Sequence, residues 1–177
     1  MRVGETIEQS GRRIGGHAWV AMRLFEALGR WSGVVEDARL RAVLATASRR
    51  FGWQAELWHR LLPAVPHLPS AALVAADADT AGLPAVLASL DAAPDGERAA
   101  VVADEVLPWL AERLEAHRAV TTPLADGPTV RVLELALAEV GRSRDALSTW
   151  VESHPSPSSW GAGAATPGGA EGRRGHP

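Results

Sequence analysis

The chain has 177 residues, of which 46% are apolar, and its formal net charge is −3. This length and composition suit one packed domain, and the absence of cysteine excludes disulfides, thiolate metal sites and cysteine nucleophiles. The basic side chains are all arginine and are dispersed along the chain, so no nucleic-acid-binding surface is expected.

The sequence also lacks the features of a membrane or secreted protein. No apolar run approaches the roughly 18 residues that a transmembrane helix requires. The first 16 residues carry several charges and have no apolar central region, unlike a secretion signal. We therefore expect a cytoplasmic protein that does not insert into a membrane.

The first predicted helix covers residues 7–31. Residues suited to a buried face recur there every three or four positions: Ile14, Ala18, Ala21 and Phe25. Ser32 and Gly33 fit the end of a helix. Two adjacent glycines, Gly15 and Gly16, are expected to loosen or break its start, because glycine disfavours a helix interior.

The second predicted helix covers residues 35–62. Its buried stripe has near-heptad spacing: Leu40, Leu44, Ala47, Phe51, Gln54, Trp58 and Leu62. Glu36 and Asp37 are expected in the first turn, where negative charge favours the helix dipole. Pro63 ends the helix because proline cannot continue it.

Residues 63–95 are rich in proline, alanine and aspartate and leave room for one or two short helices, the clearest at residues 83–92. A third long helix follows at residues 96–120. Pro108 is expected to bend it. The expected buried residues have three- and four-residue spacing: Ala99, Val102, Val106, Leu110 and Leu114.

The fourth predicted helix begins at Asp126, an N-cap residue placed shortly before Pro128, which suits a first turn. It ends near Ser153, and its expected buried stripe is Val130, Leu133, Leu137, Val140, Leu147 and Val151. Residues 155–177 are rich in Pro, Ser, Gly and Ala and have no periodicity, so we expect them to be disordered. The predicted helical domain is therefore residues 1–154.

The length of the middle segment predicts the topology. Two helical hairpins are joined by about 30 residues, and helices of 22 to 25 residues are roughly 33 to 38 Å long. A connection of this length can return the chain along the whole bundle. The pattern predicts an all-α, four-helix bundle with a long crossover between the second and third helices.

This architecture, together with the sequence Glu56-Leu57-Trp58-His59, resembles the ferritin-like superfamily. In that family one Glu from each of two helices and a Glu-x-x-His pair from each of the other two hold two metal ions. The resemblance implies iron or manganese ligands at Glu26, Glu56, His59, Glu112 and Glu139, with Glu134 as an alternative to the last. The fourth helix has no histidine before His154, so the second Glu-x-x-His pair is missing.

Helical geometry offers a simpler interpretation of the first pair. Glu56 and His59 project about 160° and 100° away from the direction of Leu40 on the second helix. Charged residues off the buried stripe are usually solvated. Glu26 can likewise form a surface ion pair with Arg30 four positions later.

Several polar residues fall on apolar faces of the predicted helices: His17, Arg113, His117 and Arg144. Polar groups on a core face need partners, so an inward polar network is one interpretation. Long side chains near helix ends can instead reach water. For His17 a satisfied core or interface histidine is expected, and for His117 a role at the helix C-terminus.

Three functions remain open from sequence. The first is a ferritin-like bundle without a complete di-metal site that acts through contacts with a protein partner or a second copy. Trp53 and Leu57 form a second apolar flank on the second helix, which either serves such contacts or packs within the chain. The second is an iron- or manganese-dependent oxidoreductase. The third is a small-molecule-binding bundle with Trp19, Trp53 and Trp58 as pocket walls. Sequence does not decide whether the protein is an enzyme.

Overall fold

The computed structural model describes residues 6–64 and 67–154, and the predicted disordered tail at residues 155–177 lies outside the described residues. The described part is helical and contains no strand, which confirms the all-α prediction. Its elements are α1 (Ile7–Ser32), α2 (Ala38–Arg60), α3 (Ser70–Leu73), α4 (Leu83–Ser89), a 3-10 turn (Leu90–Ala92), α5 (Asp95–Val101), a π-helical segment (Val102–Val106), α6 (Leu107–Val120) and α7 (Pro123–Ser153).

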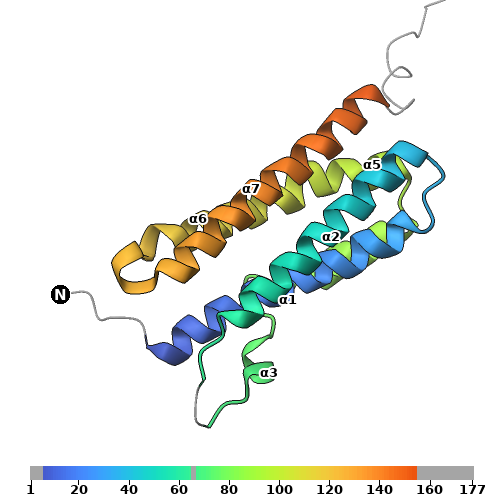
Figure 1. Ribbon diagram of the computed structural model, residues 1–177. Helices are drawn as coiled ribbons and strands as arrows, with labels where there is room; N and C mark the ends of the chain where they lie inside the picture. The colour runs from blue at the N-terminus through green and yellow to red at the C-terminus, as the bar shows by residue number, and fades with distance from the viewer. Residues whose placement is uncertain (1–5, 65–66, 155–177) are drawn as a thin grey trace, which may run out of the picture.

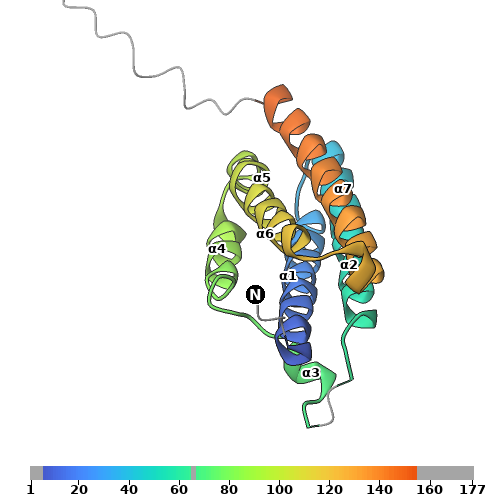
Figure 2. The ribbon, with the colours of Figure 1, turned by 90° about the vertical axis from the view of Figure 1, so that its left-hand side faces the viewer.

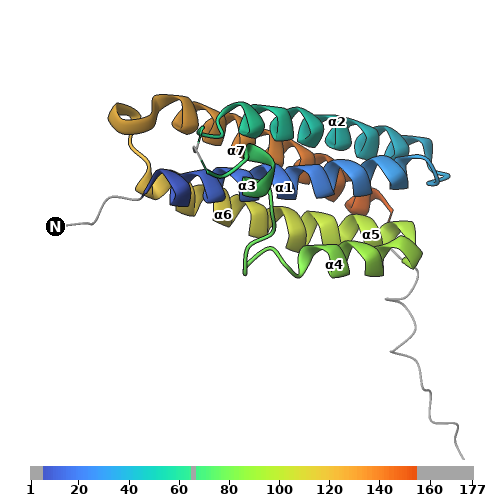
Figure 3. The same cartoon turned by 90° about the horizontal axis from the view of Figure 1, so that it is seen from below.

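The long helices form two antiparallel pairs. Figure 1 shows α1 beside α2, and the continuous rod of α5 and α6 beside α7. The segment between α2 and α5 carries α3 and α4 and returns the chain along the bundle, with α4 lying outside α1 and α5 (Figures 2 and 3). Across the described residues, no helix combines the length and the apolar character needed to cross a bilayer.

Helix α1 is unbroken at its two glycines, so the expectation that Gly15 and Gly16 would loosen it is wrong. The glycines serve a close contact instead. A Cβ atom at Gly15 would lie 1.9 Å from the carbonyl oxygen of Leu73, closer than any real contact. The missing side chain lets the end of α3 rest on the backbone of α1. At its N-terminus, Thr6 and Gln9 form a capping box.

The buried face of α1 differs from the prediction at one position. Ile14, Ala18 and Ala21 are buried as expected, but Phe25 is 41% exposed. Leu24 and Leu28 take the inward direction, and the Phe25 ring lies on the outer side of the α1–α2 pair, against Gly52.

Helix α2 follows its predicted stripe closely. The positions from Leu40 to Trp58 on that stripe are buried, and only Leu62, beyond the helix end, is partly exposed. Asp37 is not in the first turn but is the N-cap. Its Oδ1 accepts hydrogen bonds from the Leu40 amide at 2.6 Å and from the Trp150 indole at 2.9 Å, so it also ties α2 to α7.

The bend expected at Pro108 takes the form of the π-helical segment. Pro108 has no N–H and its ring crowds the carbonyl four residues earlier. One wider turn relieves this conflict, and the Leu107 amide donates to the Val102 carbonyl five positions back. All five residues predicted for the buried face of this rod are buried.

Helix α7 is kinked at Asp126, three residues after its first residue, and the helix beyond the kink begins with the predicted cap. Asp126 has non-helical backbone angles, φ −151° and ψ 67°, and its Oδ1 accepts from the Thr129 amide at 3.1 Å. The buried stripe is shifted from the predicted one: Leu133, Val140 and Leu147 are buried, whereas Val130, Leu137 and Val151 are half-buried. Ala136, Ser143 and Trp150 complete the buried face.

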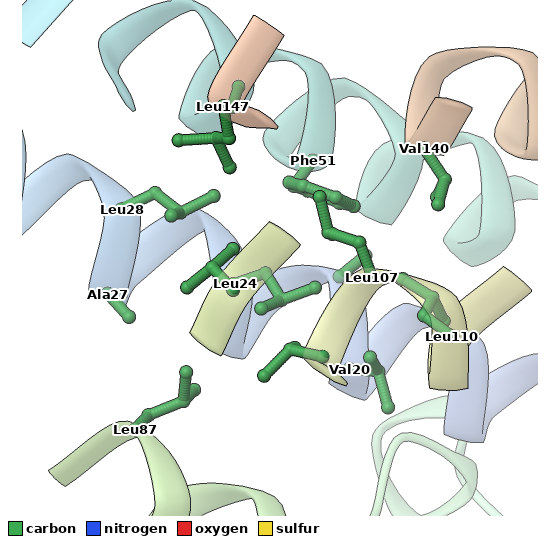
Figure 4. Packing of buried hydrophobic residues seen from close by; sticks show 14 of the residues in the cluster. Val20, Leu24, Ala27, Leu28, Phe51, Leu87, Leu107, Leu110, Val140 and Leu147 are labelled. Atoms are coloured by element: carbon green, nitrogen blue, oxygen red, sulfur yellow. The ribbon is translucent and has the colours of Figure 1, made fainter. Parts of the chain in front are cut away.

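The core is formed where the two helix pairs meet. Figure 4 shows Leu24 of α1, Phe51 of α2, Leu107 of α6 and Leu147 of α7 packed together. These side chains are almost fully buried. Truncating a buried leucine of this kind to alanine typically costs about 2–5 kcal/mol, so this contact region holds the bundle together.

Candidate functional site

An open cleft of about 1080 Å³ lies between α1, α6 and the segment that joins α3 to α4. Helix α1 contributes Gln9, Arg12, Arg13 and His17, the connecting segment contributes Asp77 and Asp79, and α6 contributes Trp109, Glu112, Arg113, Ala116 and His117. The cleft is thus lined mainly by polar and charged side chains, and its two histidines come from helices 100 residues apart.

The two histidines form a buried pair. His17 Nε2 lies 3.0 Å from His117 Nδ1, within hydrogen-bond distance, and the rings are nearly parallel, with an interplanar angle of 14°. The other neighbour of His17 is Trp58, whose ring centroid lies 4.9 Å away. His17 is 2% exposed and His117 is 5% exposed. Helix α1 supplies the first ring and α6 the second, so the pair fixes the spacing of these helices.

Both imidazoles are neutral near pH 7. Burial, and then the nearby His117 and Arg113, lower the pKa of His17 from 6.5 to about 3, against an opposing effect of Asp77. Burial, and then Arg13, lower the pKa of His117 to about 4, against an opposing effect of Asp126. Desolvation disfavours the charged imidazolium, and the arginine charges add to that effect.

Neutrality limits what the pair can do chemically. A general acid or base works best when its pKa lies near the working pH, so these rings are poor proton-transfer groups at pH 7. One N–H lies between the rings. If His17 Nε2 donates it, His117 carries its own hydrogen on Nε2 and can donate to a molecule in the cleft. The pair is therefore better suited to hold a ligand than to move a proton.

Arg113 provides a fixed positive charge beside the histidines. Its side chain is 15% exposed and forms an ion pair with Asp77, and its Nη1 lies 3.5 Å from Asp79. Both Arg113 Nε and His17 Nδ1 are buried without a hydrogen-bond partner among the described residues. Buried polar atoms are seldom left unpaired in a folded protein. His17 and Arg113 both line the cleft, and these two atoms lie beneath its surface.

The Asp77 carboxylate is held by its own segment. Thr80 is fully buried; its amide donates to Asp77 Oδ1 at 3.0 Å, and its hydroxyl lies 2.9 Å from the same oxygen. Burial raises the pKa of Asp77, but the hydrogen bonds from Thr80 and Arg113 outweigh it, and the pKa lies below its ordinary value. A Cβ at Gly16 would lie 3.2 Å from both partners of the Arg113–Asp77 pair, so Gly16 leaves the ion pair room on α1.

The ionisable side chains of the cleft balance one another. Its three arginines face three carboxylates, and the two histidines are neutral. Arg12 is also paired with Glu8 at 2.7 Å on the exposed side of α1. A cleft with no net charge does not attract simple anions or cations strongly, but its separate positive and negative groups can hold the two ends of a dipolar molecule.

Three of the predicted metal ligands lie on exposed surface. Glu26 pairs with Arg23 at 3.1 Å on α1, and Glu56 pairs with Arg60 at 3.4 Å on α2. His59 is exposed one turn beyond Glu56. This placement follows the helical directions expected for solvated residues.

The other predicted ligands lie on the second helix pair. Glu139 is held between Arg50 at 2.8 Å and Arg142 at 2.6 Å, and Glu134 is exposed. Glu112 lines the cleft described above. Within residues 6–64 and 67–154, no three or more His, Asp and Glu side chains are grouped so that they could hold a metal ion.

The polar residues predicted on apolar faces have different outcomes. His17 and His117 form a buried pair, and Arg113 beside them forms an ion pair with Asp77, so all three have inward partners, whereas Arg144 is exposed. Asp77, the partner of Arg113, was not predicted. It stands in a segment without helical periodicity, so no sequence signal connected it with α6.

A second surface feature lies on the outer side of the α1–α2 pair. Trp53 is 42% exposed, and Met22 and Phe25 are exposed beside it. Leu57, predicted to share the second apolar flank with Trp53, packs against the core. The three tryptophans predicted as walls of one pocket are separated: Trp58 is buried against His17, and Trp19 and Trp53 line two adjoining grooves.

No protein-family model, no curated protein and no solved structure matches this chain.

Proposed function

We propose that the protein binds a small zwitterionic molecule, of the amino acid or dipeptide class, in the cleft between α1 and α6. The observation that carries this proposal is the cleft itself, where Arg113 and the exposed Glu112 lie beside a buried, neutral histidine pair. Ligand sites are typically concave and contain a few convergent polar groups with perturbed pKa values. The cleft has these properties.

Size and charge favour this ligand class. The volume of about 1080 Å³ is at the upper end of the range for ligand pockets and can accept a dipeptide together with water. Arg113 Nη1 lies 3.5 Å from Asp79, which is exposed, so a ligand carboxylate can replace Asp79 there and also accept an N–H of His117. Glu112 is exposed on α6 and has no ion-pair partner among the described residues, so it can accept an ammonium group. Trp109 provides an apolar wall for a side chain.

Intrinsic tryptophan fluorescence of the full chain tests the proposal, because Trp109 lines the cleft. Titration with a panel of amino acids and dipeptides is expected to give a saturable change for at least one of them, confirmed by calorimetry. Glu112→Gln removes the ammonium partner without removing a contact of the fold. We expect it to weaken binding about tenfold, as a lost charge-assisted hydrogen bond does.

Glu115→Gln is the matched control, since Glu115 is exposed on the same helix but lies outside the cleft and pairs with Arg118. It is expected to leave the affinity unchanged. Arg113→Met should abolish binding of every panel member that carries a carboxylate. A panel without any saturable response, or equal weakening by Glu112→Gln and Glu115→Gln, would reject the proposal.

A second candidate is a ferritin-like bundle that acts through protein contacts. The order of helix directions and the long return between α2 and α5 support the ferritin-like topology. The exposed Trp53, Phe25 and Met22 support a contact surface, because large apolar side chains grouped on one face are typical of binding surfaces. Glu26→Ala, which removes a predicted metal ligand outside this contact surface, is then expected to leave the biological activity intact.

The alternative proposal, an iron- or manganese-dependent oxidoreductase, requires Glu26, Glu56, His59, Glu112 and Glu139 to act as ligands of a shared site. Metal analysis after anaerobic loading of the folded protein distinguishes it from the two candidates above. It requires stoichiometric iron or manganese, whereas the candidates above require none.

A further inference from the structure

The outer face of the α1–α2 pair carries a continuous groove. One half is lined by Trp19, Met22 and Val74, and the other half by Phe25 and Trp53; both halves include Met22 and Glu56. The segment that carries α3 crosses one end of this face, and the remainder is visible in Figure 3. This groove lies on the side of α1 that faces away from the polar cleft, so it is a separate surface.

The charges beside Trp53 are arranged symmetrically along α2. Arg49 and Glu56 are seven positions apart, so they point within about 20° of each other and lie about 10 Å apart along the helix. Arg49 is exposed and has no ion-pair partner among the described residues. Glu56 has only an exposed partner, Arg60 at 3.4 Å, and such a pair contributes little stability. The midpoint between Arg49 and Glu56 falls between Gly52 and Trp53.

This spacing has a specific consequence for two copies of the helix. When two α2 helices pack antiparallel about a twofold axis at that midpoint, Arg49 of each copy faces Glu56 of the other. The same axis places the two Trp53 side chains next to each other on one side of the line from Arg49 to Glu56, and Gly52 with the Phe25 ring of each copy on the other side. Twofold interfaces require this kind of self-complementary surface.

We propose that the α1–α2 groove binds a second copy of the chain, with two antiparallel α2 helices, reciprocal Arg49–Glu56 pairs and Trp53 at the centre. Tryptophan and arginine are the residues most often responsible for interface affinity. The dimer supplies the partner for the second candidate function above. It does not depend on ligand binding in the polar cleft, so either can fail without the other.

The available area indicates how strong the dimer can be. With the axis between Gly52 and Trp53, residues 45–60 of the two α2 helices overlap, so a contact two helices wide is about 24 Å long and about 20 Å across, or on the order of 500 Å². Standard-size interfaces bury about 800 Å² on each partner. A dimer in this register buries on the order of 1,000 Å² in total, which is typical of weak, reversible association.

Sedimentation velocity of the full chain over a wide concentration range tests the dimer. The wild-type chain is expected to dimerise reversibly. Arg49→Glu and Glu56→Arg each place like charges opposite each other twice in the dimer, and each should weaken dimerisation about tenfold or more. The double variant Arg49→Glu/Glu56→Arg restores opposite charges and should return the dissociation constant to within a few-fold of wild type.

Circular dichroism establishes that each variant is folded, and all the changed side chains are exposed. Arg118→Glu on α6 is the control for charge reversal away from the groove, and Trp53→Ser should abolish the dimer. A wild-type chain that stays monomeric at every concentration overturns the proposal. A double variant that dimerises no better than the single variants overturns the Arg49–Glu56 register.

Discussion

His17 and His117 lie in a part of the fold that cannot easily accept a proton. Their pKa values, about 3 and about 4, are below the ordinary value of 6.5 that each has in the unfolded chain. Between pH 6.5 and 4 the unfolded chain therefore binds protons that the folded chain does not. Their contribution to stability is complete above about pH 7 and falls as the pH falls toward 4.

We expect the free energy of unfolding to decrease by on the order of 2 kcal/mol for His17 alone between pH 7 and pH 5, since one pKa unit corresponds to about 1.4 kcal/mol. The lowered carboxylate pKa values, such as that of Asp77, act below this range, because an ordinary Asp pKa is already 3.8. Urea unfolding at several pH values measures the decrease. In the variant His17→Gln/His117→Gln the free energy of unfolding should depend less steeply on pH. An equally steep dependence would show that the two histidines do not cause the decrease.

Gly15 and Gly141 allow a direct comparison of two effects of a glycine-to-alanine change, the steric room for a Cβ atom and the helix propensity of the residue. A Cβ at Gly15 would meet the Leu73 carbonyl at 1.9 Å, whereas a Cβ at Gly141 in α7 would meet nothing within 4 Å. Gly15→Ala must push the α3 segment off α1 and is expected to cost about 3 kcal/mol or more. Gly141→Ala is expected to stabilise the protein by about 0.5–1 kcal/mol, because alanine favours the helix.

Thermal and urea unfolding of both glycine variants measures these effects. Equal effects would show that helix propensity alone governs both sites. The sequence could not distinguish them, because the partner of Gly15 lies almost sixty residues away in a helix of only four residues. The same limit applies to the site: helical spacing placed His17 and His117 on apolar faces, but only the packing of α1 on α6 brings them together.

At the scale of elements, two aspartate caps differ in what they hold. Asp126 caps the part of α7 beyond the kink through the Thr129 amide, whereas Asp37 caps α2 and also accepts the Trp150 indole N–H. Asp126→Ala is expected to cost about 1 kcal/mol. Asp37→Ala should cost about 2–3 kcal/mol, because the buried indole N–H loses its partner as well.

Urea unfolding of the two cap variants gives the comparison. Asp37→Asn, which keeps a side-chain oxygen, should recover most of the loss. If Asp37→Ala and Asp126→Ala were equally destabilised, the Asp37–Trp150 hydrogen bond would contribute nothing.

The long elements were predictable because each has local signals at both ends. Asp126 marks the start of α7, Pro63 follows the end of α2, and helical spacing identified most of the buried face of α2. Helix α3 was not predicted, since it is short and has no side-chain cap. The π-helical segment was not predicted either: Pro108 showed that the rod must adjust, but not that the adjustment would fall one turn earlier.

At the scale of the whole molecule, the lengths of the segments predicted the topology. Helix lengths and the long middle segment predicted two hairpins with a return between them, and the all-helical part of that prediction is confirmed. The cleft was not predictable, because Asp77 comes from the return segment itself. The segment that connects α2 to α5 therefore supplies Asp77, the carboxylate that pairs with Arg113.

The polar cleft and the apolar groove share α1 but use different sides of it. On a helical projection Met22 and Trp19 lie about 140° to 160° around the helix from His17. His17 contacts His117 and Trp58 in the interior, while Met22 lines the outer groove. Because the helix between them is continuous and well packed, a change on one side should have little effect on the other.

We therefore expect Trp53→Ser to abolish dimerisation while leaving the affinity for a cleft ligand within about twofold, and Glu112→Gln to do the reverse. Distant, independent sites have additive effects within about 0.5 kcal/mol, so the double variant should show both losses unchanged. Calorimetry and sedimentation on the same four proteins measure this. A double variant whose ligand affinity differs by tenfold from that of Glu112→Gln would mean that α1 couples the two surfaces, and that dimerisation reshapes the cleft.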